Sequence, residues 1–229
     1  MKKTLFALLF LGSILPGRAQ KIIEKHMDFS AGEFISMDFQ VSDSIHIVTW
    51  NKNEVYIRSS VNVNDNQDND AYSMYFDQSG KNVAIRGKLK LQEGRGCRTL
   101  DKGDTSEKHG NNCCCCCRSE IIHEVFIPEE ADFSVETINA NIVITGKTGA
   151  VRAHSISGYI DLALAPERAG SLDMRTITGT MYSNYDLPSD SHKPRHVGGG
   201  SVSAELNGGK GKRIELETIS GDIFFRKAG

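Results

Sequence analysis

The sequence lacks an excess of basic residues, lacks sustained helical periodicity and, beyond residue 19, lacks any apolar run long enough to cross a bilayer. It has 229 residues, with 27 Lys and Arg against 29 Asp and Glu. Residues 1–19 hold Lys2, Lys3 and Arg18 but no acid, so the formal charge changes from -2 to -5 without them. Nucleic-acid-binding proteins usually carry a basic face or stripe. We therefore expect no nucleic-acid partner and no transmembrane span in the mature chain.

Familiar catalytic motifs are also missing. There is no G-x-S-x-G elbow, P-loop or H-E-x-x-H segment. Asp161, Asp173 and Asp222 lie at different offsets within the repeats described below, so they predict no aligned pair of carboxylates. We expect a protein that is not an enzyme and has no cofactor. The alternative is a carbohydrate-active β-helix enzyme that acts on an acidic polysaccharide.

Residues 1–19 have the pattern of a secretory signal peptide. A basic start is followed by an apolar stretch from Leu5 to Leu15 and by a small residue, Ala19, before the expected cut. A membrane anchor would need about 20 apolar residues. The segment predicts an exported protein located in the periplasm, on the outer surface or outside the cell.

Residues 20–91 alternate apolar and polar side chains with the period of β-strands. One hairpin is predicted over 45–63 with its turn at 51–53, and a second over 72–85 with its turn at 78–81. Glycines, mixed charges and cysteines replace this pattern over 92–119, a stretch too long for an ordinary connection. We interpret the chain as a signal peptide, an N-terminal β portion (20–91), an insertion (92–119) and a repeat region (120–229).

The repeat region contains five copies of one short motif. An apolar residue, here called the anchor, is followed by a small polar residue and then usually by glycine. In four copies another apolar residue stands four positions after the anchor, whereas the Leu206 copy has Lys210 there. The anchors are Ile138, Ile156, Ile177, Leu206 and Ile219. The glycines are Gly158, Gly179, Gly208 and Gly221, and Ala140 occupies this place in the first copy.

Each position of the motif has an expected role. The anchors and the apolar residues that follow four positions later are expected to point into a shared core. The small polar residues are expected to form a hydrogen-bonded ladder, and the glycines are expected to permit tight corners. Short strands joined by corners, repeating about every 20 residues, predict an all-β fold with a β-solenoid after the N-terminal hairpins. A β-sandwich is the alternative.

The repeats, most clearly at 216–223, resemble the bacterial "putative adhesin" family of β-strand repeats, an autotransporter-adhesin-like domain of unknown function. The segment Ile45–Ile57, which contains Trp50–Val55, resembles the strand-turn-strand that often precedes the repeats in that family. The resemblance covers about 32–227. It implies a right-handed single-stranded β-helix outside the cytoplasm and supplies no catalytic residues. We expect a non-enzymatic interaction protein that binds a protein or glycan at the cell surface.

Six cysteines are present, and five of them are consecutive. Neighbouring Cα atoms lie about 3.8 Å apart, below the usual disulfide range of about 4.4–6.8 Å, so the run is a poor internal disulfide framework. Three interpretations stay open: a low-complexity patch, intermolecular cross-links and a thiol or soft-metal site. The candidate metal ligands are Cys97, His109, Cys113, Cys114, Cys115, Cys116, Cys117 and His123.

The final copy ends with Ile223, close to the end of the sequence. Because the end of a solenoid exposes strand edges unless it is capped, an edge-paired oligomer is expected there, and the cysteine run adds a disulfide-linked oligomer as a second expectation.

Overall fold

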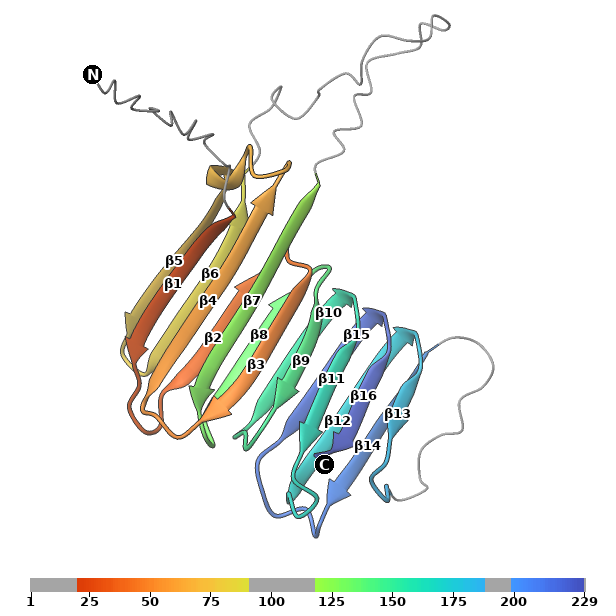
Figure 1. Cartoon of the computed structure of the whole chain (residues 1–229). Helices are drawn as coiled ribbons and strands as arrows, with labels where there is room; N and C mark the ends of the chain where they lie inside the picture. The colour runs from red at the N-terminus through yellow and green to blue at the C-terminus, as the bar shows by residue number, and fades with distance from the viewer. Residues whose placement is uncertain (1–19, 91–117, 188–198, 229) are drawn as a thin grey trace, which may run out of the picture.

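Alternating apolar and polar residues extend along most of the chain, and the structure accordingly consists of β-strands. A computed structural model describes residues 20–90, 118–187 and 199–228 (Figure 1). The predicted signal peptide, Cys97, His109 and the run Cys113–Cys117 lie outside these residues. The described part has sixteen strands and one short 3-10 helix, η1 (Asn69–Ala71), so the all-β prediction is confirmed. None of its helices has the length and apolar character needed to cross a membrane.

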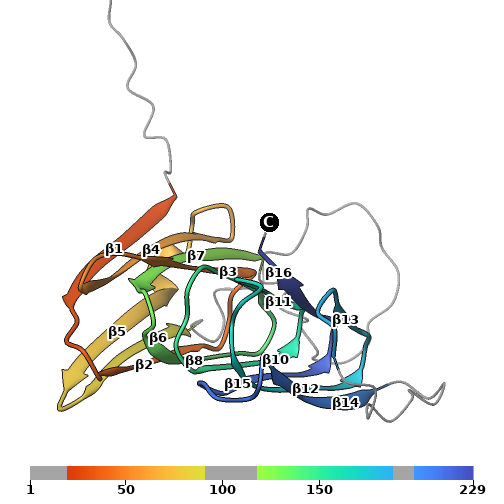
Figure 2. The same cartoon turned by 90° about the horizontal axis from the view of Figure 1, so that it is seen from below.

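The strands form two mixed sheets of eight strands each, stacked as two layers (Figure 2). The first, sheet A, has the spatial order β1 (Lys21–Asp28), β4 (Glu54–Val63), β7 (Ser119–Pro128), β3 (Ser44–Trp50), β9 (Asn141–Thr145), β11 (Ile160–Leu164), β16 (Ile223–Lys227) and β13 (Met181–Ser183). The second, sheet B, has the order β14 (Gly200–Leu206), β12 (Gly170–Thr178), β15 (Ile214–Ser220), β10 (Val151–Ser157), β8 (Asp132–Thr137), β2 (Phe34–Phe39), β6 (Asn82–Leu89) and β5 (Tyr72–Ser79). The sheets do not close on each other, and two facing sheets fit the sandwich alternative as well as the solenoid.

The core lies between the two layers. Every second residue of β4 is buried, and the same alternation brings apolar side chains of the other strands into this space. One continuous cluster extends from Met27 on β1 to Phe225 on β16. Burying a large aliphatic side chain contributes about 1.5–3 kcal/mol, so this cluster is the main source of stability.

The order of the strands departs from the sequence order at two places. The expected hairpin of β3 and β4 is wrong, because β7 lies between these two strands and pairs with both. The second expected hairpin is confirmed, since β5 and β6 pair in antiparallel fashion. At the other end of the chain, β15 lies between β10 and β12, and β16 lies between β11 and β13. The final copy is therefore internal, and the expectation that it ends the stack is wrong.

The anchor isoleucines do not enter the core, contrary to the expectation. The side chains of Ile138, Ile156, Ile177 and Ile219 are 38–49% exposed. The residue before each anchor is buried instead: Thr137, Ser155, Thr176 and Thr218. Because side chains alternate along a strand, an inward hydroxyl residue places the following isoleucine outward. The glycine corner then interrupts the alternation, so that Ile142, Ile160 and Ile223 return to the core.

The buried hydroxyl groups find hydrogen-bond partners at the corners. Thr218 Oγ1 lies 2.8 Å from the carbonyl oxygen of Gly221, and Thr176 Oγ1 lies 3.0 Å from the same oxygen. The two hydroxyl oxygens are 2.9 Å apart. The polar ladder of the corners thus consists of the residues before the anchors, whereas the expected ladder residues after the anchors are exposed.

The copy at Leu206 does not stack with the other four. Its strand, β14, runs antiparallel to β12, and Leu206 lies opposite Gly170 and is buried. Gly208 follows in a turn with φ +88°, and a Cβ there would meet nothing within 4 Å. This copy supplies the antiparallel edge strand of sheet B and does not add another parallel strand.

The other three motif glycines lie in one column, where the backbones of neighbouring copies approach each other closely. A Cβ at Gly158 would collide with the carbonyl of Ala140, one at Gly221 with that of Gly158, and one at Gly179 with that of Gly221. Ala140 occupies the glycine place in the copy next to Gly158, and its side chain is buried. Packing between copies therefore requires all three glycines, and Gly158 in addition has a φ of +134°, which favours glycine.

We predict that Gly221→Ala lowers the free energy of unfolding by about 3 kcal/mol, because its methyl group would overlap the carbonyl of Gly158. The matched control is Gly200→Ala, whose Cβ would meet only the end of the Met181 side chain, at 3.3 Å. Urea unfolding followed by circular dichroism measures both. Equal stability of the two variants would contradict the close approach at the corner.

Candidate interaction face

His123 is the one predicted metal ligand within the described residues. It is fully buried and stacks on Phe39, with ring centroids 4.1 Å apart. Nδ1 lies 2.7 Å from Ser59 Oγ, and Nε2 lies 3.1 Å from Ser42 Oγ and 3.2 Å from the Tyr72 hydroxyl. Both ring nitrogens are thus occupied by hydroxyl groups. No cluster of three or more potential metal ligands occurs in the described part of the chain.

The carboxylates considered for catalysis lie on three separate surfaces. Asp161 accepts a hydrogen bond from Arg226 Nε at 2.8 Å on sheet A. Asp173 pairs with Arg213 at 3.0 Å on sheet B, and Asp222 accepts the backbone N–H of Thr180 at 2.7 Å at a corner. Each carboxylate is occupied by a local partner, so the structure does not bring these residues together.

The exposed anchors share one register on the outer face of sheet B. Flanking ladder pairs place them opposite one another on adjacent strands, in the spatial order Ile138, Ile156, Ile219 and Ile177. They are four of the ten exposed large hydrophobic side chains among the described residues. We call this set the isoleucine row. Contiguous exposed apolar side chains of this kind are typical of interaction sites.

A charged row runs beside the isoleucine row, two residues earlier on each strand. Its members in spatial order are Glu136, His154, Glu217 and Arg175. None of them forms an ion pair with another described residue. The preceding row, which has the order Ser134, Arg152, Glu215 and Asp173, differs because Arg152 and Glu215 pair with each other at 3.0 Å.

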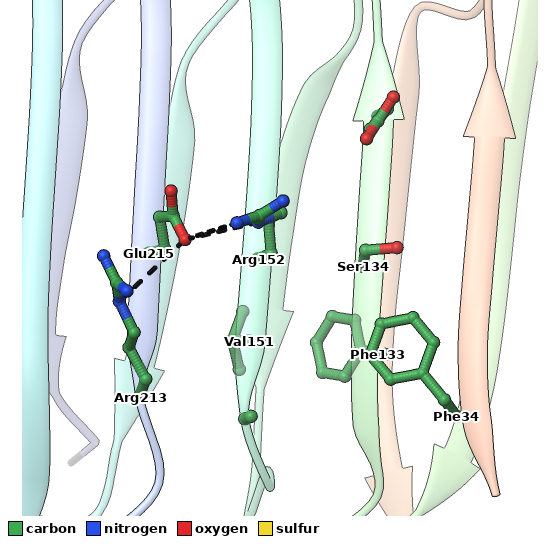
Figure 3. Close-up of a pocket in the computed structure, with 9 residues that line it drawn as sticks. Phe34, Phe133, Ser134, Val151, Arg152, Arg213 and Glu215 are labelled. Atoms are coloured by element: carbon green, nitrogen blue, oxygen red, sulfur yellow. Dashed lines mark hydrogen bonds and ion pairs between the residues drawn. The ribbon is translucent and has the colours of Figure 1, made fainter.

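A shallow pocket of about 350 Å³ lies on the same face (Figure 3). Its lining residues are Phe34, Phe133, Ser134, Glu136, Ala150, Val151, Arg152, Arg213 and Glu215. In Figure 3, Arg152 and Arg213 approach Glu215 from both sides, at 3.0 and 4.0 Å. The pocket combines apolar walls with charges that largely neutralise one another, so it favours no strongly charged ligand.

The outer face of sheet A carries a different feature, a cluster of half-buried aromatic rings. Trp50 and Phe126 have ring centroids 5.2 Å apart, and Tyr56 lies 5.8 Å from Phe126 and 4.4 Å from His26. The Trp50 indole N–H donates to the carbonyl of Glu54 at 2.9 Å. These rings pack against one another across neighbouring strands and stabilise the sheet.

The motif pattern predicted the wrong side of the strand for the four isoleucine anchors, the right side for Leu206, and did not indicate the charged row. A signal was present, because Thr or Ser precedes four of the five anchors. A repeated hydroxyl residue of this kind can satisfy its hydrogen bonds at a buried corner. Isoleucine is more apolar than threonine or serine, so the isoleucines were predicted to be buried. Strand alternation allows only one of two adjacent residues to face the core, and the hydroxyl residue takes that place.

Comparison with known proteins supports the fold. No family model matches the chain, and no curated protein matches its sequence. The crystal structure of a "putative cell adhesion protein" from Clostridium sporogenes matches with a TM-score of 0.53 and 10% identity, covering 92% of this chain and 100% of that chain. A "putative adhesin" from Bacteroides fragilis matches with a TM-score of 0.21 and 10% identity, covering 92% and 99%. At 10% identity, the match with the Clostridium protein is a likeness of fold.

We predict that Ile219→Ser changes the free energy of unfolding by only about 0.5 kcal/mol, because this side chain is exposed. Ile223→Ser, four residues away in the same copy, should cost about 4 kcal/mol because Ile223 is fully buried. Chemical unfolding of the two variants side by side checks this contrast. A large loss of stability for Ile219→Ser would indicate that Ile219 lies in the core.

The burial of His123 predicts a loss of stability in mild acid. Burial lowers the pKa of His123 from 6.5 to about 3. The unfolded chain therefore binds more protons below pH 6.5, and the stability due to the neutral ring declines as the pH falls below that value. Between pH 7.5 and 5.0 this loss is about 2 kcal/mol.

Urea unfolding of the wild type and of His123→Phe at both pH values isolates this effect. The variant should be less stable at pH 7.5, because Ser59 and Tyr72 lose a partner, but its stability should fall less on acidification. An equal fall in both proteins would mean that His123 is not buried in its neutral form.

Proposed function

We propose that this chain is an exported, non-enzymatic, adhesin-like protein that binds a partner at the bacterial cell surface or in the periplasm. The observation that supports this function best is the isoleucine row. Four copies of one motif each present an isoleucine to solvent at the same register, and the core does not use these side chains. A repeated apolar side chain without a structural role is expected where a partner binds.

We also infer that the two sheets are wound as a β-solenoid. In four copies a strand of sheet B leads through a corner into a strand of sheet A, as β10 leads into β11. Both strands then pair in parallel with those of neighbouring copies. Regular stacking of this kind produces flat faces on which equivalent residues form rows.

The likeness of fold to the Clostridium sporogenes "putative cell adhesion protein" agrees with a role in surface interaction. The predicted signal peptide would bring the chain to that location, and its acidic balance argues against a nucleic-acid partner. The partner is a protein or a glycan. A thiol or metal function of Cys113–Cys117 is a separate prediction, which mass spectrometry with and without reductant would test.

The enzyme alternative has less support from the described residues. Asp161, Asp173 and Asp222 are spread over three surfaces and occupied locally. The pocket on sheet B holds Glu215 in ion pairs with two arginines. A glycosidase would instead need two carboxyl groups about 5–10 Å apart across the scissile bond.

Binding of purified, labelled residues 20–229 to intact cells of the producing bacterium tests the proposal. The double variant Ile156→Ser/Ile219→Ser should be retained about tenfold less than the wild type, because it removes the centre of the isoleucine row. The control is Ile22→Ser/Val48→Ser, which removes two exposed apolar side chains from sheet A and should be retained normally.

Equal retention of the wild type and the double variant would contradict the assigned face. Turnover of an acidic polysaccharide, abolished by one carboxylate substitution, would replace the proposal with the enzyme alternative. Expression of the full chain followed by fractionation tests export separately, and the exported form should begin at Gln20.

A further inference from the structure

We propose that the partner of this face is a second copy of the same chain, related by a two-fold axis that runs parallel to the strands between β10 and β15. This inference rests on the proposed function, since it names the occupant of the same face. A two-fold interface requires a surface that is complementary to itself. The order of residues in three neighbouring rows of sheet B meets this requirement.

The two-fold rotation makes each row face its own copy in reverse order. The four strands follow one another as β8, β10, β15 and β12, so β10 faces β15 of the second copy and β8 faces β12. In the isoleucine row, Ile156 then lies opposite Ile219 of the second copy, and Ile138 lies opposite Ile177. Both copies place these side chains at the inter-strand spacing of about 4.8 Å, so all four isoleucines of one row meet an isoleucine of the other.

The charged row becomes complementary in the same arrangement. Glu136 lies opposite Arg175 of the second copy, and His154 lies opposite Glu217. Each of these contacts occurs twice by symmetry. Within one chain these four residues form no ion pair with another described residue, so they are available to a second copy.

The preceding row supports the same axis. Arg152 lies opposite Glu215 of the second copy, and Ser134 lies opposite Asp173, which its hydroxyl can reach as a donor. Beyond the four central strands, the charged row continues with Asp38 on β2, which faces Ser201 on β14 of the second copy. No two like charges face each other in these rows.

Other placements of the axis are disfavoured by charge. An axis through β15 would place Glu217 against Glu217 of the second copy, and an axis through β10 would place Glu136 against Glu217. Like charges placed opposite each other across an interface are costly. The position between β10 and β15 avoids both contacts, so the charges favour it over these two placements.

The size of the face predicts a weak dimer. Four strands span about 14 Å, and the three rows extend roughly 13 Å along the strands. The contact is therefore smaller than the roughly 800 Å² per partner that stable complexes bury, and micromolar dissociation constants are expected. Many copies at a cell surface would raise the effective concentration and make such a weak contact sufficient for adhesion.

Analytical ultracentrifugation of purified residues 20–229, with reductant to exclude cysteine cross-links, tests this inference. The wild type should form a concentration-dependent dimer. Glu136→Arg alone and Arg175→Glu alone should each weaken dimerisation by about tenfold or more, because each creates two like-charge contacts. An equimolar mixture of the two variants should dimerise again, because both contacts in the mixed dimer are complementary.

Two further variants complete the test. Ile156→Ser/Ile219→Ser should weaken the dimer by at least about 100-fold, since each substitution acts twice by symmetry. Glu120→Arg on sheet A is the matched charge control and should leave the dimer unchanged. A wild type that stays monomeric at high protein concentration, or a variant mixture that does not dimerise, would overturn the inference. Cell binding that still depends on Ile156 and Ile219 would in that case leave the proposed function standing with a different partner.

Discussion

The close approach of backbones at the glycine corners is the constraint on which the rest of the structure depends. At Gly158, Gly221 and Gly179 a Cβ would collide with the carbonyl of the neighbouring copy. These contacts hold the copies in one register, and hydroxyl groups that bond to the same corner carbonyls reinforce it. Because register decides which side of a strand faces the core, the corner also decides which residues reach solvent.

The exposed rows follow directly from that register. The buried Thr218 places Ile219 outward and Glu217 outward as well, on either side of it along the strand. Because the same pattern recurs on four paired strands, equivalent residues lie side by side and form an isoleucine row beside a charged row. The face has the properties of a binding surface, because it is flat, apolar at one row and charged at the next, and its charges are not all used within the chain.

Much of the fold could be predicted from the sequence. The period of two predicted the strands, the repeated glycines predicted corners, and the turn at 78–81 predicted the hairpin of β5 and β6. The pairing of β3 with β7 and the insertion of β15 between β10 and β12 could not be predicted. Local patterns indicate which residues form strands. Which strands pair with each other depends on contacts between segments far apart in the chain.

The all-β character, the repeat and its glycine corners follow from local propensity and spacing, so they can be predicted without coordinates. The exposure of the four isoleucine anchors and the third place of the last copy in the stack follow from strand pairing instead. In sequence order, the charged row would run Glu136, His154, Arg175 and Glu217, and its reversal would oppose Glu136 to Glu217. In the spatial order the same reversal opposes Glu136 to Arg175. The complementarity of the face is thus a property of strand order, which hydrogen bonding between distant strands sets and no local pattern contains.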